Sequence, residues 1–467
     1  MKAILKYILA AVTLPISLSA FAQSAHSSYF LENMTYRQNM NPAFAPDFNY
    51  VNIPALGGIQ LGMNSNVGLG SFLFPQNDEM VTGLNSSISP DEFLGKLNKN
   101  NIMELDLRIN ILSFGFAQWG GFNTFSVSTR SNVGAYLPYE LFEFAKIGQI
   151  DGAPTEYDIN NIRVNTSNYA EIALGHSRNI TDRLSVGAKL KVLAGILNTD
   201  AEISNLNVYM SGEKWQIKES GKIFSSNSMN VKFKENGEID NFSTSFGVDG
   251  FGLGLDLGAS YKLLDNLTLS AAITDIGFIS WKGEEALANP EPFVFDGFSN
   301  IGGEDPTTGE SSIDSEIDQI EEDLKGLTRF SQEQQVSKSQ TLTTTLNVGA
   351  EYGILNNKIS FGLLSSTRFG MPIVWSEVMA AANFRPTSWF NATINGNFSN
   401  IRQSMGVMLN FCPKGFNFFI GSDYIPFKYS KEGIPLYNAK FNLLFGMSFT
   451  FNPNRSLDRQ TRLGCRQ

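Results

Sequence analysis

Hydrophobic and polar residues alternate along several stretches of the chain. In residues 253–261, three leucines, an alanine and a tyrosine at odd positions are separated by glycine, aspartate and serine at even positions. Residues 184–192 and 441–451 show the same two-residue period. An amphipathic helix would have a period near 3.6, whereas a β-strand places successive side chains on opposite faces. The pattern therefore predicts β-strands with one apolar and one polar face.

The predicted strands are joined as hairpins by short turns. Residues 261–266 and 352–357 connect two alternating stretches through Asp and Asn or Gly and Asn, and residues 384–388 use Arg-Pro. These residue types tolerate or preset the backbone angles of tight turns. We expect about fourteen strands, beginning near residues 57, 103, 121, 168, 184, 252, 267, 341, 359, 374, 389, 404, 416 and 440.

Connection lengths along this series alternate. The connections after the even-numbered strands are short, and most of those after the odd-numbered strands are long. Bacterial outer-membrane barrels have this asymmetry, with short periplasmic turns, long outer loops and an even number of strands. We therefore predict an all-β protein, a transmembrane antiparallel β-barrel of about 14 strands.

The composition agrees with a barrel wall. Charged residues make up only 17% of the chain, compared with about 25% in a typical soluble domain. Phenylalanine (37 residues) and glycine (42 residues) are abundant. Beyond the N-terminus, no uninterrupted apolar stretch reaches the roughly 18 residues of a spanning helix.

The N-terminus has the features of an export signal. Lys2 and Lys6 precede a mostly apolar stretch at 7–18, and Ala20-Phe21-Ala22 is a small-x-small cleavage site. Removing residues 1–22 takes away two lysines and no acid, so the formal net charge changes from −10 to −12. We expect export to the outer membrane, and the negative charge disfavours nucleic acid as a partner.

The mature chain divides into three predicted parts. Residues 23–56 contain Pro42 and Pro46 and do not alternate, so we expect a hatch or plug inside the barrel; a periplasmic N-terminal tail is the alternative. Residues 57–451 would form the barrel, and residues 452–467 a periplasmic C-terminal tail.

The long outer loops contain predicted helices. Ser89-Pro90 and Pro138 mark helix starts, and isoleucines at helical spacing within the acidic segment 283–338 indicate a surface helix. The first two helices would carry apolar side chains that either pack together as a lid or form a binding site for a lipophilic ligand: Phe93, Leu94, Leu141, Phe142 and Phe144.

Five ionisable residues fall on the lumen-facing side of the predicted strands: Glu171, Lys189, Lys191, Asp256 and Glu351. We interpret them as interior salt bridges, with a catalytic or selectivity cluster as the alternative. Cys412 in a predicted periplasmic turn and Cys465 in the tail would both face an oxidising compartment, so a disulfide between them is predicted.

The residues argue against enzymatic chemistry. With two histidines and two cysteines far apart in the sequence, neither a histidine-based triad nor a Cys/His zinc site is expected. The glycine-rich stretch 250–254 runs directly into a strand and is not a phosphate loop. We expect a protein that is not an enzyme, with no metal and no cofactor.

Asn41-Pro42-Ala43 shortly after the signal, followed by alternating hairpins, resembles an uncharacterised family of Bacteroidetes-type outer-membrane barrels. These are similar to FadL-like transporters of hydrophobic compounds and to PorV-like barrels of a secretion system. The resemblance implies a fourteen-stranded barrel in which Asn41, Pro42, Ala43 and the adjacent Phe44 are hatch residues. The sequence lacks the Gly- and Ala-rich stretch usually found before this motif in FadL relatives.

The expected function is therefore passive passage of small hydrophobic molecules across the outer membrane. Lipid of that membrane and a small hydrophobic ligand would be the partners. A docking or structural barrel that binds a secretion-system or surface-protein partner is the alternative, as the resemblance to PorV-like barrels implies. A lipid-modifying barrel enzyme is less favoured, because no histidine falls in the predicted outer loops.

Overall fold

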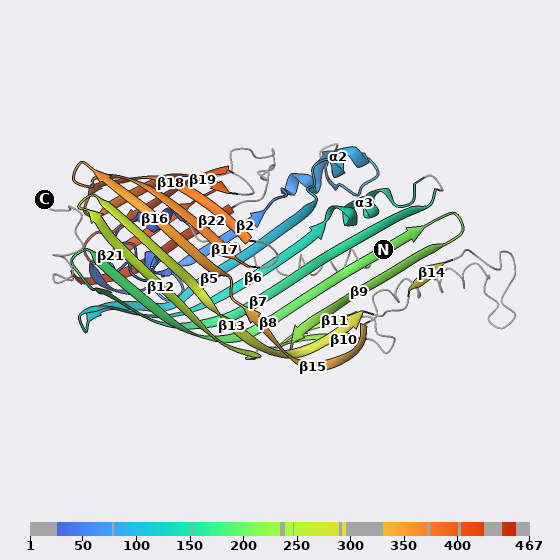
Figure 1. Cartoon of the computed structure of the whole chain (residues 1–467), viewed down its shortest axis with the longest axis horizontal. Coiled ribbons are helices and arrows are strands. Elements are labelled where there is room, and N and C mark those ends of the chain that lie inside the picture. Colours follow the sequence, from blue (N-terminus) through green and yellow to red (C-terminus); the bar gives the residue numbers. More distant parts are fainter. Residues whose placement is uncertain are drawn as a thin grey trace.

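The computed structural model describes residues 26–453 except 77–78, 151–152, 234–238, 246, 289–291, 296–329, 371–373, 400–402 and 425–440. These residues form a closed antiparallel β-barrel, drawn in Figure 1. The wall has fourteen strands, because β1 and β2 together form one interrupted strand and β9, β14 and β15 of the same sheet extend outside it. The predicted fold class is confirmed.

The wall strands follow the chain in order: β1 Phe48–Asn52, β2 Ile59–Ser65, β5 Asn100–Gln118, β6 Gly121–Pro138, β7 Thr155–Asn179, β8 Leu184–Met210, β12 Gly250–Leu264, β13 Leu267–Ala288, β16 Thr344–Ile354, β17 Ile359–Phe369, β18 Val374–Thr387, β19 Phe390–Ser399, β20 Gln403–Phe411, β21 Phe416–Ser422 and β22 Phe441–Pro453. The barrel closes where β1 and β2 pair with both β22 and β5.

The remaining elements belong to the loops and the N-terminal segment. The outer strands are β3 Leu73–Gln76, β4 Glu79–Thr82, β9 Trp215–Ser226, β10 Met229–Phe233, β11 Ile239–Thr244, β14 Phe293–Phe295 and β15 Phe330–Thr341. The helices are η2 His26–Phe30, η3 Thr35–Asn39, η4 Leu69–Ser71, α2 Pro90–Leu94 and α3 Tyr139–Ile147. Both predicted outer-loop helix starts are confirmed: the Ser89 hydroxyl accepts from the Glu92 amide at the start of α2, and Pro138 directly precedes α3 at its N-cap position.

Two predicted strand starts are wrong. The first strand begins at Phe48 rather than near residue 57, so the predicted hatch (23–56) extends too far into the wall. An insertion between β1 and β2 interrupts the alternation there. The fourth strand begins at Thr155 rather than near 168, because Asn161, with a φ of 62°, shifts the alternating pattern partway along β7.

The outer surface of the wall is apolar. Leu174, Leu190 and Leu253 are 62%, 65% and 60% exposed, whereas their lumen-facing neighbours Glu171, Lys191 and Asp256 are buried. Aromatic side chains are exposed near the short turns: Tyr261, Tyr352, Phe384 and Phe451. Among the described helices, none is long and apolar enough to cross a membrane. The predicted alternation is therefore confirmed: apolar side chains face outward, and polar side chains face the lumen.

One side of the barrel is much taller than the other. β7 and β8 have 25 and 27 residues, whereas β20 and β21 have 9 and 7. Figure 1 shows β7, β8, β9, α2 and α3 continuing beyond the rim at the end opposite the short turns. We call this extension the outer wing.

Candidate functional site

The segment from His26 to Asp47 lies inside the barrel, and we call it the plug. Its side chains are buried against lumen-facing residues of the short side of the wall. The plug contributes Tyr29, Phe30, Leu31, Met34, Tyr36, Met40 and Phe44 to this core. The wall contributes Leu364, Met379, Ala381, Met408, Phe419 and Leu444. Burial of these apolar surfaces holds the plug in place.

The Asn41-Pro42-Ala43 motif forms a close backbone contact between plug and wall. The Asn41 side-chain amide lies 3.3 Å from the carbonyl oxygen of Ala259 and 3.4 Å from that of Ala271. Its side-chain oxygen accepts from the Ala43 amide at 3.0 Å. Asn41 is completely buried, so it fixes a turn of the plug to two neighbouring strands.

Two glycines in the wall make room for this turn. A Cβ on Gly258 would lie 2.1 Å from the Asn41 side-chain oxygen, and a Cβ on Gly187 would lie 2.3 Å from the Pro42 carbonyl oxygen. Real Cβ atoms do not approach other atoms so closely, so both positions require glycine for the close backbone approach.

Polar contacts anchor the plug at its N-terminal end. The His26 amide donates to Asp423 at 2.5 Å, and the His26 ring Nδ1 lies 2.8 Å from Glu377 Oε1. The Tyr424 hydroxyl donates to the other Glu377 oxygen at 2.6 Å. Burial lowers the pKa of His26, but the hydrogen bond and negative charge of Glu377, with Asp423, outweigh it and raise the pKa.

A second anchor lies near the short turns. Arg385 donates to Glu351 Oε1 at 2.5 Å and to the Phe30 carbonyl oxygen at 2.8 Å. The Glu32 carbonyl oxygen accepts from the side-chain amides of Asn391 and Asn410. Glu351, one of the predicted lumen charges, therefore acts in an ion pair that holds the plug.

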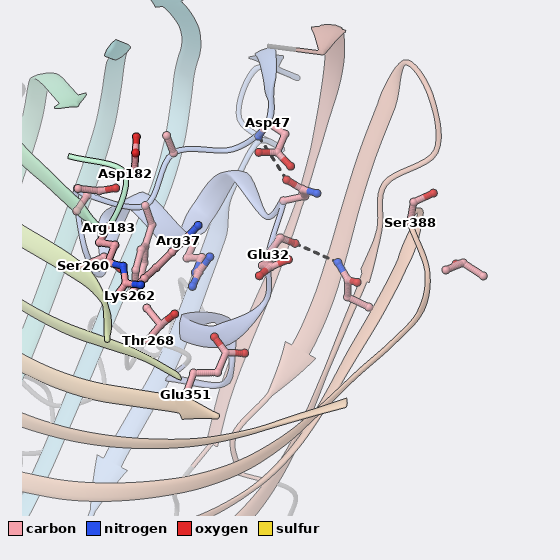
Figure 2. A pocket seen from close by; sticks show the side chains of 17 residues that line it. Glu32, Arg37, Asp47, Asp182, Arg183, Ser260, Lys262, Thr268, Glu351 and Ser388 are labelled. Carbon is pink, nitrogen blue, oxygen red and sulfur yellow. Dashed lines mark hydrogen bonds between the residues drawn. The ribbon is translucent and has the colours of Figure 1, made fainter. Parts of the chain in front are cut away.

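A cavity of about 270 Å³ lies beneath the plug on the side of the short turns. Figure 2 shows Glu32, Arg37 and Asp47 of the plug facing Lys262 and Glu351 of the wall across it. We call it the lower cavity. Its lining carries charges of both signs, contributed by plug and wall together.

Above the plug, a network of ion pairs crosses the lumen. Lys191 Nζ lies 2.6 Å from Asp256 and 2.5 Å from Asp275. Arg130 lies 2.9 Å from Asp275, and Arg108 lies 2.7 Å from Glu171. Three of the predicted lumen charges, Glu171, Lys191 and Asp256, thus lie in one salt-bridge network.

A fourth predicted lumen charge contacts the plug directly. Lys189 Nζ donates to the Asn39 side-chain oxygen at 3.0 Å and lies 3.4 Å from the Gln38 carbonyl oxygen. Asp275, which the sequence analysis did not single out, occupies a bulge of β13 with a φ of 60°. The bulge breaks the alternation that would have marked Asp275 as lumen-facing.

A larger cavity of about 540 Å³ lies on the outer side of this network, and we call it the vestibule. The order of residues along β8 shows where the vestibule lies relative to the plug. From the short turns outward, Ser185 lines the lower cavity and Lys189 contacts the plug. Lys191 then joins the ion pairs, and Asp200 lines the vestibule. Plug and ion pairs therefore lie between the two cavities.

The predicted apolar ligand residues of the outer loops lie in small cores of the wing. Phe93 and Leu94 are buried with Phe74 and Ile88. Leu141 is buried with Tyr157 and Ile159, Phe142 packs against both groups, and Phe144 contacts Tyr157. These five side chains mainly join α2 and α3 to the wing, and the two cavities have other linings.

Two further predictions concern residues at or beyond the described part. Cys412 lies half-buried between β20 and β21, but Cys465 lies outside the described residues, so their disulfide stays a prediction. The predicted signal peptide, the predicted surface helix of the acidic segment and most of the predicted C-terminal tail also lie outside them. Within the described residues, no group of three His, Cys, Asp or Glu side chains could hold a metal ion.

Fold and site together define a closed β-barrel whose lumen is occupied by its own N-terminal segment. The chain belongs to the family of unknown function DUF5723, whose family model matches residues 42–423. A comparison with curated proteins found no match.

Several solved structures are similar to this chain. The toluene transporter TbuX of Ralstonia pickettii is 9% identical with a TM-score of 0.42, covering 94% of this chain and 98% of that chain. The toluene transporter TodX of Pseudomonas putida is 9% identical with a TM-score of 0.38, covering 93% and 95%. A FadL homologue of Pseudomonas aeruginosa is 10% identical with a TM-score of 0.34, covering 93% and 95%.

Proposed function

We propose that this protein is an outer-membrane barrel through which small hydrophobic or amphipathic molecules pass when the plug is displaced. The observation that carries the proposal is the plug itself, which separates an outer vestibule from a lower cavity within one closed wall. A barrel of this width would hold a water-filled channel if its interior were not occupied.

The exposed apolar belt supports a location in a membrane. Only a closed barrel or a helix satisfies all backbone hydrogen bonds within lipid, and the wall here is closed. The short turns lie at one end and the long loops at the other (Figure 1). This asymmetry favours an orientation with the short turns in the periplasm and the wing outside the cell.

An apolar strip on the vestibule wall supports a hydrophobic portion in the ligand. Tyr169, Ile279 and Leu342 all line the vestibule, and they pack on one buried cluster with Leu193 and Trp281. Apolar surface of this kind, next to a few polar groups, is what small-molecule sites usually offer.

Movement of the plug would open the path, and it would have to break polar contacts and separate the apolar core that plug and wall share. Many of the polar contacts are hydrogen bonds to side chains, such as those made by Asn41, Lys189 and Arg385, rather than strand pairings with the wall. Water or a passing ligand can replace such bonds at modest net cost, so exposure of the apolar core is the larger part of the cost of displacement.

The test is deletion of residues 28–46. In liposomes containing the purified protein, we expect the deletion to raise permeability to small sugars and uptake of the hydrophobic dye N-phenylnaphthylamine. Heat-dependent gel migration would show that the variant barrel is folded. A folded variant with unchanged permeability to both probes would refute the proposal.

The wing favours a second candidate function, a docking barrel for a secretion-system or surface protein. Its strands β7 and β8 pair along their whole length and rise beyond the rim, where Asn205 joins Asp158 and Asn160 in a polar side-chain ladder. Shortening this hairpin should abolish co-purification of a surface partner without changing permeability. Retained co-purification would exclude the wing as the docking surface.

A further inference from the structure

Hydrogen-bonding side chains cover the vestibule wall formed by β2, β5, β6 and β7. In the middle row, Asp106 on β5 lies opposite Asn132 on β6, which lies opposite Ser167 on β7. All three residues line the vestibule. Because paired positions on neighbouring strands share a face, this row presents a carboxylate, an amide and a hydroxyl side by side.

The next row toward the outside has the same chemistry. Asn64 on β2 lies opposite Glu104 on β5, and Gly134 on β6 lies opposite Asn165 on β7. Asn64 is 2% exposed, and its side-chain oxygen has no hydrogen-bond partner among the described residues. A buried acceptor that lines a cavity without a partner is a position where a ligand donor would be favourable.

Gly134 makes room for a side chain of this row. A Cβ at that position would lie 2.4 Å from the Asn165 side-chain oxygen. Glycine therefore makes room for the Asn165 side-chain amide, which lies over Gly134 and lines the vestibule.

The row nearest the plug supplies charges that are already compensated. Arg108 and Arg130 lie opposite each other in the register and share Glu171 as an ion-pair partner, at 2.7 Å and 3.5 Å. Arg130 also pairs with Asp275 and donates to the Tyr169 hydroxyl at 3.2 Å. A charged ligand group would have to displace one of these partners, whereas a neutral polar group would not.

The polar rows adjoin the apolar strip. Tyr169 belongs to both, because it ends the row nearest the plug and packs with Ile279 and Leu342. The vestibule therefore has a hydrogen-bonding wall, on which Arg108, Arg130 and Asp106 are ion-paired, beside an apolar wall, within about 540 Å³. Cavities of roughly 300–1,000 Å³ hold small organic ligands.

We propose that the vestibule binds a small amphipathic molecule with a neutral, hydroxyl-rich head, such as one sugar ring, and a short apolar or aromatic tail. This inference rests on the proposed passage function and names the ligand class. The head would bridge the amides and carboxylates of the rows formed around Asn64 and Asn132. The tail would lie on Tyr169, Ile279 and Leu342. A pure hydrocarbon would leave the polar rows without water or partner, which disfavours it.

The experiment measures calorimetric binding to the full chain in lipid nanodiscs, with phenyl β-glucoside, glucose, toluene and benzoate as probes. We expect phenyl β-glucoside to bind most tightly. Replacing Asn64 and Asn132 together by leucine, which is similar in size, should weaken its binding on the order of tenfold, because two hydrogen bonds are lost. The control N205L, in the wing, should leave binding unchanged.

Three results would overturn the ligand class. These are tighter binding of toluene than of phenyl β-glucoside, tighter binding of benzoate, or no effect of the double substitution. Failure of the passage function is distinguishable, because it would appear as unchanged permeability after plug deletion. If the deletion opens the barrel but phenyl β-glucoside does not bind, the ligand class is wrong and the passage function stands.

Discussion

The lumen has two levels whose inward-facing side chains have different surroundings. At the plug level, the wall and the plug hydrogen-bond to each other. Asn41 of the plug donates to two wall carbonyl oxygens, and Arg385 of the wall donates to Glu351 and to the Phe30 carbonyl oxygen. At the vestibule level, the same inward alternation presents polar groups such as Asn64 to a cavity of about 540 Å³. The plug level therefore serves structure, and the vestibule level is available for binding.

The wall itself reflects this division. On its short side, lumen-facing positions at the plug level carry Leu364, Met379, Met408 and Leu444, which are buried in one core with the plug. In an empty lumen these side chains would face water, which costs free energy in proportion to their apolar area. Wall and plug sequences are thus matched to each other.

The largest expected effect comes from filling the space that receives the plug. Substituting Gly258→Val would place side-chain atoms where the Asn41 oxygen and the Pro42 ring now lie, at 2.1 Å and 2.8 Å from a Cβ. We expect the plug to leave its site, with permeability approaching that of the plug deletion. Liposome swelling with small sugars measures this effect.

A second glycine provides the control for that substitution. At Gly396 a Cβ would meet only the Phe398 ring, at 4.0 Å, so G396V should keep the barrel closed. Equal permeability of the two variants would show that the plug is not held by the close approach at Gly258.

A smaller but still large effect is expected at the Arg385 anchor. Arg385→Met leaves Glu351 buried without its partner, which typically costs about 3–5 kcal/mol in a buried pair. Protease cleavage within the plug should become faster, and the double variant R385M/E351Q should recover part of the protection. If R385M alone leaves cleavage unchanged, the ion pair does not hold the plug.

The sequence was sufficient to predict the barrel because alternation is a local signal. Leu253, Asp256 and Lys191 face the sides that their parity indicates, and the short turns join the predicted strands. The prediction was wrong where local geometry breaks the two-residue period. Asn161 and Asp275 both have positive φ values and interrupt the alternation. As a result, the start of β7 was placed too late in the sequence, and Asp275 was not recognised as a member of the ion-pair network.

The candidate site was only partly predictable for a different reason. Glu171, Lys189, Lys191, Asp256 and Glu351 are visible as inward charges, but their partners come from strands distant in sequence, such as Arg108 and Arg385. Register between neighbouring strands also brings Asn64, Asp106 and Asn132 onto one wall. No spacing within a single strand encodes that arrangement.

The smallest expected effect concerns the N-terminal anchor and depends on pH. Because the pKa of His26 is raised above 6.5 by Glu377 and Asp423 despite burial, its contribution to plug docking is complete below pH 6.5. It is lost as the pH rises through the raised value. Arg368, which opposes the raised pKa, and Tyr424, which shares Glu377, also face this group.

Hydrogen exchange of the plug amides between pH 6 and pH 9 measures this contribution, after correction for the intrinsic pH dependence of exchange. We expect docking to weaken by about 1.5–3 kcal/mol over that range in the wild type, the size of a hydrogen bond to a charged group. H26Q should remove the pH dependence, whereas H176Q, which changes the only other histidine, should retain it. If H26Q keeps the full pH dependence, the titrating group is Glu377 or Asp423. The charge of His26 would then not contribute to plug docking at the N-terminal anchor.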